Sequence, residues 1–178
     1  MTRSQEIHPG SLDGARASFP VDFEAELRPL LRPALRLAAG LLGDPTEAED
    51  AEHEAALLAW RRAANRWPDS DLRPWFLAIV ANRCRERRRG RWARVLRIAD
   101  PPPPAASGDD HEGDLDVRAA LRALPYDARL ALVLRHYLDL SFDDVSVVLG
   151  CSVEAARSRV RRAAAQISPS LQVVEGLA

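Results

Sequence analysis

The stretch LSFDDVSVVLGCSVEAARSRVRR, residues 140–162, reads as two short helices joined by a tight turn. Ser141 and Ser152 stand where each helix begins, and a serine hydroxyl there accepts a hydrogen bond from the backbone N–H groups of the first turn. Gly150 stands where a residue with left-handed backbone ends the first helix. The segment therefore predicts a helix-turn-helix, whose second helix enters the major groove of DNA.

The second of these predicted helices has an apolar face and a basic face. Val153, Ala156, Val160, Ala163 and Ile167 recur at helical spacing and should face inward. Because a helix turns by about 100° per residue, a second set of residues projects away from this apolar face. Arginines on such a surface suit phosphates and guanine edges. The alternative for this segment alone is a helical hairpin with a solvated basic face. The outward residues are Ser158, Arg161 and Arg162, with Arg157 and Arg159 on the flanks.

A second basic segment, residues 83–97, contains eight arginines and one glutamate. Like charges crowded on a helix destabilise it. The only acid nearby in the sequence is Glu86, so the segment predicts an anionic partner such as nucleic-acid phosphate. A solvated tail, a membrane surface and an acidic protein are the alternatives. Aromatic residues around the segment suit the stacking of unpaired bases. They are Trp67, Trp75, Phe76 and Trp92, of which Trp67 and Trp75 could equally be core and Phe76 is expected to be core.

An acidic helix is predicted to follow Gly43, with Asp44 as its N-cap. Asp50 and Glu54 are one turn apart and share a face. A paired-carboxylate active site is one interpretation, but no glycine-rich loop, metal-ligand spacing or nucleophile accompanies the pair. A protein-docking face is favoured, with His53 as a surface residue beside it.

The order of these segments predicts two small helical domains and no strands, because no alternating apolar pattern appears. Pro29 and Pro33 interrupt an otherwise helical apolar stripe, which predicts a kinked helix or one that begins late. Four prolines after Asp100, followed by a Gly/Ser/Asp run, indicate an exposed linker. The predicted divisions are a flexible N-terminal tail (1–19), a helical domain (20–97), a Pro/Asp-rich linker (98–115), a helix-turn-helix domain (116–168) and a C-terminal tail (169–178).

Composition narrows the class of protein. The chain has 178 residues and a formal net charge of −1, which conceals opposite local charges. Cys84 and Cys151 lack metal-ligand spacing, which favours a reduced cytoplasmic protein without metal or cofactor. No apolar run approaches the roughly 20 residues that span a bilayer, and the polar N-terminus is no signal peptide. No catalytic constellation is present, so an enzyme is not expected.

These segments, in this order, resemble a bacterial RNA polymerase sigma factor of the extracytoplasmic-function (ECF) type. The resemblance covers about residues 20–97, as region 2, and 115–168, as region 4. GDPTEAEDAEHEA at 43–55 is similar to the polymerase-docking helix of region 2, and LRPWFLAIVANR at 72–83 to the segment that reads the −10 promoter element. LRALPYDARLALVLRHYLDLS at 121–141 is similar to the start of region 4.

The resemblance implies a role for each surface. Core RNA polymerase, through its β′ clamp helices and β flap, and promoter DNA would be the partners, with an anti-sigma factor as a further one and no membrane insertion. The polymerase-binding residues would be Asp50, His53 and Glu54. The residues that bind the −10 promoter element would be Trp67, Asp69, Ser70, Asp71, Trp75, Asn82, Arg83, Arg85, Arg88 and Arg89. The residues that bind the −35 promoter element would be Ser152, Glu154, Arg157, Ser158, Arg161 and Arg162.

Four positions depart from the family pattern. His53 stands in place of a frequent glutamine, Leu72 in place of an aromatic residue, and Val147 in place of a polar residue, while Pro33 is an addition. Two other functions fit part of the sequence. A stand-alone helix-turn-helix regulator would bind a palindromic operator as a dimer without polymerase. A sigma-like adaptor would bind polymerase or an anti-sigma factor without opening promoters.

Overall fold

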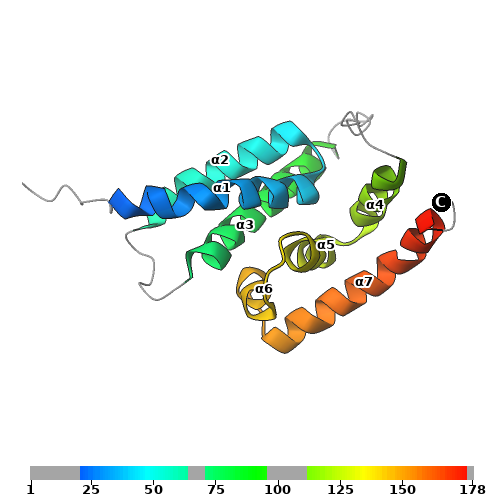
Figure 1. Ribbon diagram of the computed structural model, residues 1–178. Helices are drawn as coiled ribbons and strands as arrows, with labels where there is room; N and C mark the ends of the chain where they lie inside the picture. Colours follow the sequence, from blue (N-terminus) through cyan, green and yellow to red (C-terminus); the bar gives the residue numbers. More distant parts are fainter. Residues whose placement is uncertain (1–20, 64–70, 96–111, 176–178) are drawn as a thin grey trace, which may run out of the picture.

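The computed structural model describes residues 21–63, 71–95 and 112–175, and within these ranges every regular element is helical. Figure 1 shows α1 (Val21–Leu42), α2 (Pro45–Arg62) and α3 (Leu72–Val95) grouped at one end of the molecule. The other group comprises α4 (Glu112–Ala123), α5 (Tyr126–Leu132), the π-helix η2 (Val133–Tyr137), α6 (Phe142–Leu149) and α7 (Val153–Glu175). The predicted all-α fold is confirmed.

Helix α1 includes both of its prolines, Pro29 and Pro33, so the prediction that this helix begins late was wrong. An interior proline costs a helix about 3 kcal/mol. Burial of the apolar face offsets that cost, because Leu37 and Leu41 are almost inaccessible to solvent. Tertiary packing thus overrides local helix propensity here.

Helix α2 packs closely on its neighbours through small side chains. Ala48, Ala51, Ala55 and Ala59 recur along one face and are fully buried. The helix begins as predicted, because Asp44 accepts a hydrogen bond from the N–H of Glu47 over 2.9 Å. The alanine face lets α1 and α3 approach α2, and Glu49, Asp50 and Glu54 are left exposed on its other sides.

The helix-turn-helix forms as predicted from residues 140–162. The hydroxyl of Ser141 accepts a hydrogen bond from the N–H of Asp144 at 3.1 Å, and that of Ser152 from the N–H of Ala155 at 3.2 Å. Gly150 ends α6 with φ 61°, in the left-handed region that glycine adopts without strain. Ala156, Val160 and Ala163 are buried as the helical spacing predicted, whereas Val153 and Ile167 are half-buried.

Two helices extend beyond the predicted domain limits. Helix α4 begins at Glu112, within the range predicted to be linker. Helix α7 continues to Glu175, so residues 169–175 are helical where a tail was predicted. The tail 1–19 and most of the predicted linker, 98–111, lie outside the described residues.

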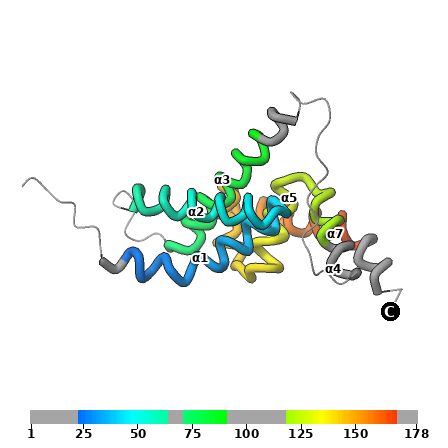
Figure 2. Tube along the Cα trace, turned by 90° about the horizontal axis from the view of Figure 1, so that it is seen from above, coloured from blue at the N-terminus to red at the C-terminus, as the bar shows by residue number. Residues whose placement is uncertain are grey.

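The two groups of helices share one apolar core, and α3 packs against α6. Seen from above, α1 and α2 lie toward one end of the molecule and α4 and α7 toward the other (Figure 2). Arg129 of α5 connects the two groups through a buried guanidinium group. It donates hydrogen bonds to the carbonyl of Leu41 at the end of α1, over 2.8 Å, and to the carbonyls of Arg122 and Leu124 at the end of α4. Carbonyls at the C-terminus of a helix carry partial negative charge and favour a cation. Burial lowers the pKa of Arg129 to about 10, so it stays charged at neutral pH.

Candidate nucleic-acid interface

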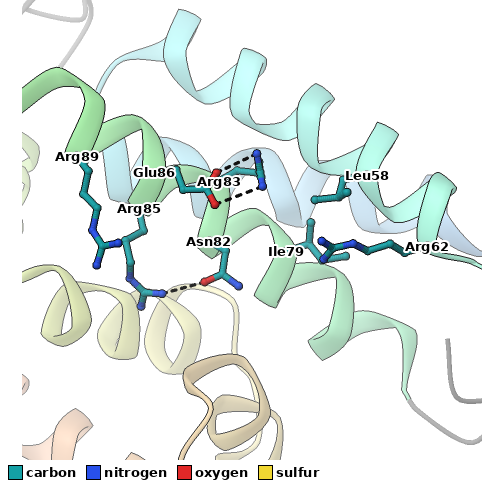
Figure 3. A pocket seen from close by; sticks show the side chains of 8 residues that line it. All are labelled: Leu58, Arg62, Ile79, Asn82, Arg83, Arg85, Glu86 and Arg89. Atoms are coloured by element: carbon teal, nitrogen blue, oxygen red, sulfur yellow. Dashed lines mark hydrogen bonds and ion pairs between the residues drawn. The ribbon is translucent and has the colours of Figure 1, made fainter. Parts of the chain in front are cut away.

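Helices α2 and α3 line an open, shallow basic pocket of about 300 Å³ (Figure 3). Leu58 and Ile79 supply its apolar part, and Asn82 contributes an amide. The Oδ1 atom of Asn82 accepts a hydrogen bond from Nη1 of Arg85 over 2.9 Å. The rest of the lining is charged and consists of Arg62, Arg83, Arg85, Glu86 and Arg89. An apolar floor with arginines and an amide around it suits a nucleotide, with its base on the floor and its phosphate at the rim.

The arginines of α3 have more acidic partners than the sequence indicated. Arg83 pairs with Glu86 at 2.9 Å, as their spacing suggests. Arg85 reaches Asp127 of α5 at 2.9 Å. Arg87 reaches Asp50 at 3.3 Å and Glu54 at 2.5 Å. Glu86 is the only acid nearby in the sequence, but folding brings three more carboxylates to this helix.

Arg88 and Arg89 form no ion pair with the described residues. The guanidinium carbon of Arg88 lies 5.6 Å from the ring centre of Tyr126, in cation–π geometry, and its Nη1 atom is buried without a hydrogen bond among the described residues. Arg89 is exposed at the pocket rim and has no ion pair or hydrogen bond within the described ranges. Among the arginines of the segment whose side chains the structure describes, Arg89 is thus the most available to an external phosphate.

The acidic face of α2 has the half-exposed pair that was predicted. The side chains of Asp50 and Glu54 are 58% and 51% exposed and converge on Arg87. The hydrogen bond that Arg87 donates to the Glu54 carboxylate raises the pKa of Arg87, which fixes its charge. His53 is on the surface, as expected. Glu52 differs from its acidic neighbours, because it is buried and its burial raises the carboxyl pKa.

The start of α3 is only partly described. Trp67, Asp69 and Ser70, predicted to form the base pocket of the −10 element, lie outside the described residues. Asp71 accepts a hydrogen bond from the N–H of Arg73 at 2.9 Å, in the residues that begin the helix. Trp75 is half-buried against the core. Phe76 is fully buried, which confirms its expected place in the core.

Helix α7 presents the other predicted DNA surface. Arg161 and Arg162 are exposed on the side opposite to the buried residues. Arg157 is exposed as well, lies over the Phe142 ring at 5.3 Å and reaches Glu154 at 4.0 Å. Ser158 is half-buried, and the Ser152 hydroxyl is engaged as the cap of the helix. In the described part of the chain, Arg161 has no partner, so this surface is available to DNA.

The described residues offer little support for a reactive thiol, a metal site or a membrane-spanning helix. The thiol of Cys84 is buried, and burial raises its pKa to about 12, so it packs as an apolar group. In the described ranges no cluster of His, Cys, Asp or Glu could hold a metal ion. None of the described helices combines the length and the apolar character needed to cross a bilayer.

A helix-turn-helix that packs against an arginine-rich helix with a basic pocket defines a DNA-binding protein built from two groups of helices. Comparison with known families gives the same division. Residues 26–94 match the model for sigma-70 region 2, and residues 114–167 match the model for sigma-70 region 4.

Similar proteins narrow the class further. An ECF RNA polymerase sigma factor, EcfG of Rhodopseudomonas palustris, is 34% identical over 79% of this chain and 81% of its own length. The RNA polymerase sigma-H factor of Pseudomonas aeruginosa is 30% identical over 78% of this chain and 80% of its own. Among solved structures, the sigma factor RpoE of Bartonella quintana, in complex with the anti-sigma factor NepR, aligns with a TM-score of 0.71 and 26% identity over 85% of this chain and 98% of that one. CnrH, in complex with the cytosolic domain of CnrY, aligns with a TM-score of 0.60.

The chain belongs to the ECF RNA polymerase sigma factors. It is a sigma factor that binds core RNA polymerase, recognises promoter DNA and promotes the initiation of transcription. A stand-alone helix-turn-helix regulator would not account for the match to region 2, which covers α2 and most of α1 and α3.

Some residues of the site were not predicted from the sequence. Arg62 lines the pocket from α2, Arg87 holds the acidic pair, and Tyr126 and Asp127 cover part of α3. Arg87 was visible as a member of the basic run, but its role depends on partners 33 and 37 residues away. No local pattern indicates such a pairing.

Proposed function

We propose that three described surfaces divide the work of promoter recognition. The acidic face of α2, formed by Asp50, His53 and Glu54, docks on the β′ clamp helices of core polymerase. The pocket and arginines of α3 hold the melted strand of the −10 element. Helix α7 reads the −35 element as duplex DNA, while region 4 also contacts the β flap. The observation that carries this division is the placement of arginines on two separate surfaces, one on α3 and one on α7.

The −35 role is supported by the geometry of α7. Its buried face packs on the rest of region 4, so its outer face is held at a fixed angle. The outer face offers Arg161 and Arg162, with Arg157 and Glu154 beside them. Guanidinium groups bind phosphates and donate two hydrogen bonds to guanine. Ser152 contributes mainly as the cap that orients the first turn, and Ser158 lies one turn later near the same surface.

The −10 role is supported by the chemistry of α3. Asn82 has a donor and an acceptor for the edge of a base, and the Leu58–Ile79 floor suits its apolar face. Arg83, Arg85, Arg88 and Arg89 supply positive charge for the backbone. Trp67, Asp69, Ser70, Asp71 and Trp75 are proposed to capture the flipped base. Capture offsets an unstacking cost of a few kcal/mol.

The docking role is supported by the arrangement of the acidic pair. Arg87 orients both carboxylates while leaving each about half exposed, so a basic partner meets a fixed pair of acceptors. The protein acts by binding and positioning, without catalysis of its own, in the cytoplasm where polymerase transcribes. An anti-sigma factor is a further proposed partner, because the RpoE and CnrH structures to which the fold is similar are complexes with NepR and CnrY.

Binding and promoter opening by defined variants test this division. Asp50→Asn with Glu54→Gln should weaken the affinity for purified core polymerase by about ten-fold, since charge-assisted hydrogen bonds are lost. Glu24→Gln with Glu49→Gln removes the same charge from other exposed positions and should leave the affinity unchanged. Fluorescence of 2-aminopurine in the −10 element then reports opening. Equal affinities for both double variants would refute the proposed docking face, and wild-type holoenzyme that never opens a promoter would identify an adaptor.

A further inference from the structure

The two halves of the chain meet on the same arginines that we assign to the melted strand. Asp127, the second residue of α5, accepts a hydrogen bond from Nη2 of Arg85 at 2.9 Å. The ring of Tyr126 lies 5.0 Å from the guanidinium carbon of Arg85 and 5.6 Å from that of Arg88. The Tyr126 hydroxyl donates to the backbone carbonyl of Ala81 over 2.5 Å. Both residues therefore lie against α3 in its strand-binding segment.

These contacts reproduce the chemistry of a bound nucleotide. The carboxylate of Asp127 accepts from Arg85 as a phosphate oxygen would. The Tyr126 ring receives the two guanidinium groups on its face, as an unstacked base would. One acidic residue beside one aromatic residue thus occupies the groups that would otherwise bind a single strand.

We propose that Tyr126 and Asp127 mask the strand-binding arginines of α3 when the protein is free of polymerase, so that a single strand must displace α5 before it binds. This inference rests on the proposed strand-binding role of α3. It adds a competition within the chain: region 4 covers part of region 2 until the two separate. Arg161 and Arg162 of α7 stay exposed in the same arrangement, so only one of the two DNA surfaces is masked.

The surrounding interface explains why the mask stays in place. An isolated and partly exposed ion pair is worth at most about 1 kcal/mol. Here further contacts position α5: Arg129 donates to the carbonyl of Leu41, and Arg73 donates to the carbonyl of Leu138, each over 2.8 Å. A methyl group added at Gly40 would come within 3.2 Å of Val133, which shows how closely α1 and η2 approach. Because these contacts already hold α5 in place, the pairing of Asp127 with Arg85 requires little further loss of backbone conformational entropy.

The binding test uses full-length protein without polymerase and a fluorescein-labelled 20-mer of deoxythymidine. Asp127→Asn should bind the oligonucleotide about three- to five-fold more tightly than wild type at low salt, because the competing carboxylate is weakened. Asp143→Asn is the matched control, since Asp143 is also an exposed second residue of its helix and the change in net charge is the same. It should bind like wild type. Equal gains for both variants would overturn the competition.

A distance measurement tests the mask without DNA. Spin labels at Glu49→Cys on α2 and Gln166→Cys on α7, with Cys151→Ser to remove a reactive thiol, should give one narrow distance in the free protein and a longer one with core polymerase. A broad distribution in the free protein would show that the halves do not stay together and would overturn the mask. A narrow distance with no oligonucleotide binding by any variant would instead refute the strand-binding role of α3, and the competition with it.

Discussion

Helices α3 and α7 both carry many arginines, but they use them differently. On α3, Arg83, Arg85 and Arg87 are ion-paired with carboxylates of the same chain, and Arg88 lies against Tyr126. On α7, Arg161 and Arg162 point to solvent. Arginine density therefore does not by itself measure how available a surface is to DNA. The duplex-reading surface is exposed in the free fold, whereas the strand-binding surface is largely satisfied from within.

The largest expected effect concerns the link between the two regions. Arg129→Met removes donors from the carbonyls of Leu41, Arg122 and Leu124 and leaves them unpaired at buried helix ends. The free energy of unfolding should fall by about 3 kcal/mol. Urea denaturation monitored by circular dichroism measures this. Arg161→Met, an exposed change of the same type, should stay within about 0.5 kcal/mol of wild type. Comparable losses would show that the buried position of Arg129 is unimportant.

The next effect separates recognition from stability on α7. Arg161→Ala with Arg162→Ala should lower promoter-specific transcription about 100-fold, because each lost base or phosphate contact costs about 1–3 kcal/mol. The thermal unfolding midpoint should not change, since both side chains are exposed. Arg32→Ala with Arg36→Ala removes the same charge from the exposed side of α1 and serves as the control. If the two double variants lose the same activity, net charge rather than the α7 surface is responsible.

A smaller effect is expected for a single arginine of α3. Arg89→Ala should weaken the binding of holoenzyme to a single-stranded −10 oligonucleotide about five-fold. The slope of log K against log salt should become less steep by about 0.7, as expected for one lost phosphate contact. Fluorescence anisotropy over a salt series gives both values. An unchanged salt slope would mean that Arg89, although exposed, does not meet a phosphate.

The smallest effect tests the buried carboxyl of α2. Burial raises the pKa of Glu52 above its usual 4.5, so the stability that comes from its protonated form is lost as the pH rises through the raised pKa. Glu52→Gln should therefore stabilise the protein by about 1 kcal/mol at pH 7.5, and the gain should vanish near pH 4. Exposed Glu49→Gln is the matched control and should leave the free energy of unfolding at pH 7.5 within about 0.5 kcal/mol of wild type in parallel thermal melts. Loss of stability at pH 7.5 would show that the charged form of Glu52 is needed.

Local features of the fold could be predicted from the sequence because each depends on a few neighbouring residues. Ser141, Ser152 and Asp44 cap helices through backbone groups three residues away, and Gly150 ends a helix through its own backbone angle. The outward face of α7 follows from helical spacing alone. The family resemblance, which was based on the order of the segments along the chain, was confirmed by the matches to regions 2 and 4.

Features that depend on the approach of distant segments were not predictable in this way. Arg85 and Asp127 are 42 residues apart in the chain, and nothing near either one indicates the other. Glu52 belongs to an acidic series by composition, yet the packing of α2 places it inside while Asp50 and Glu54 stay outside. The π-helix η2, in which Leu138 donates to the carbonyl of Val133, was not predicted from the sequence either.

Run-off transcription with purified core polymerase and genomic fragments of the source organism tests the central claim most directly. The wild-type chain should yield promoter-specific transcripts. The double variant of α7 (Arg161→Ala, Arg162→Ala) and a matching double variant of α3 (Arg88→Ala, Arg89→Ala) should each lose them while still binding polymerase. Transcripts that persist at wild-type levels in both variants, or a wild-type chain that yields none, would contradict the account of two arginine surfaces acting on one promoter.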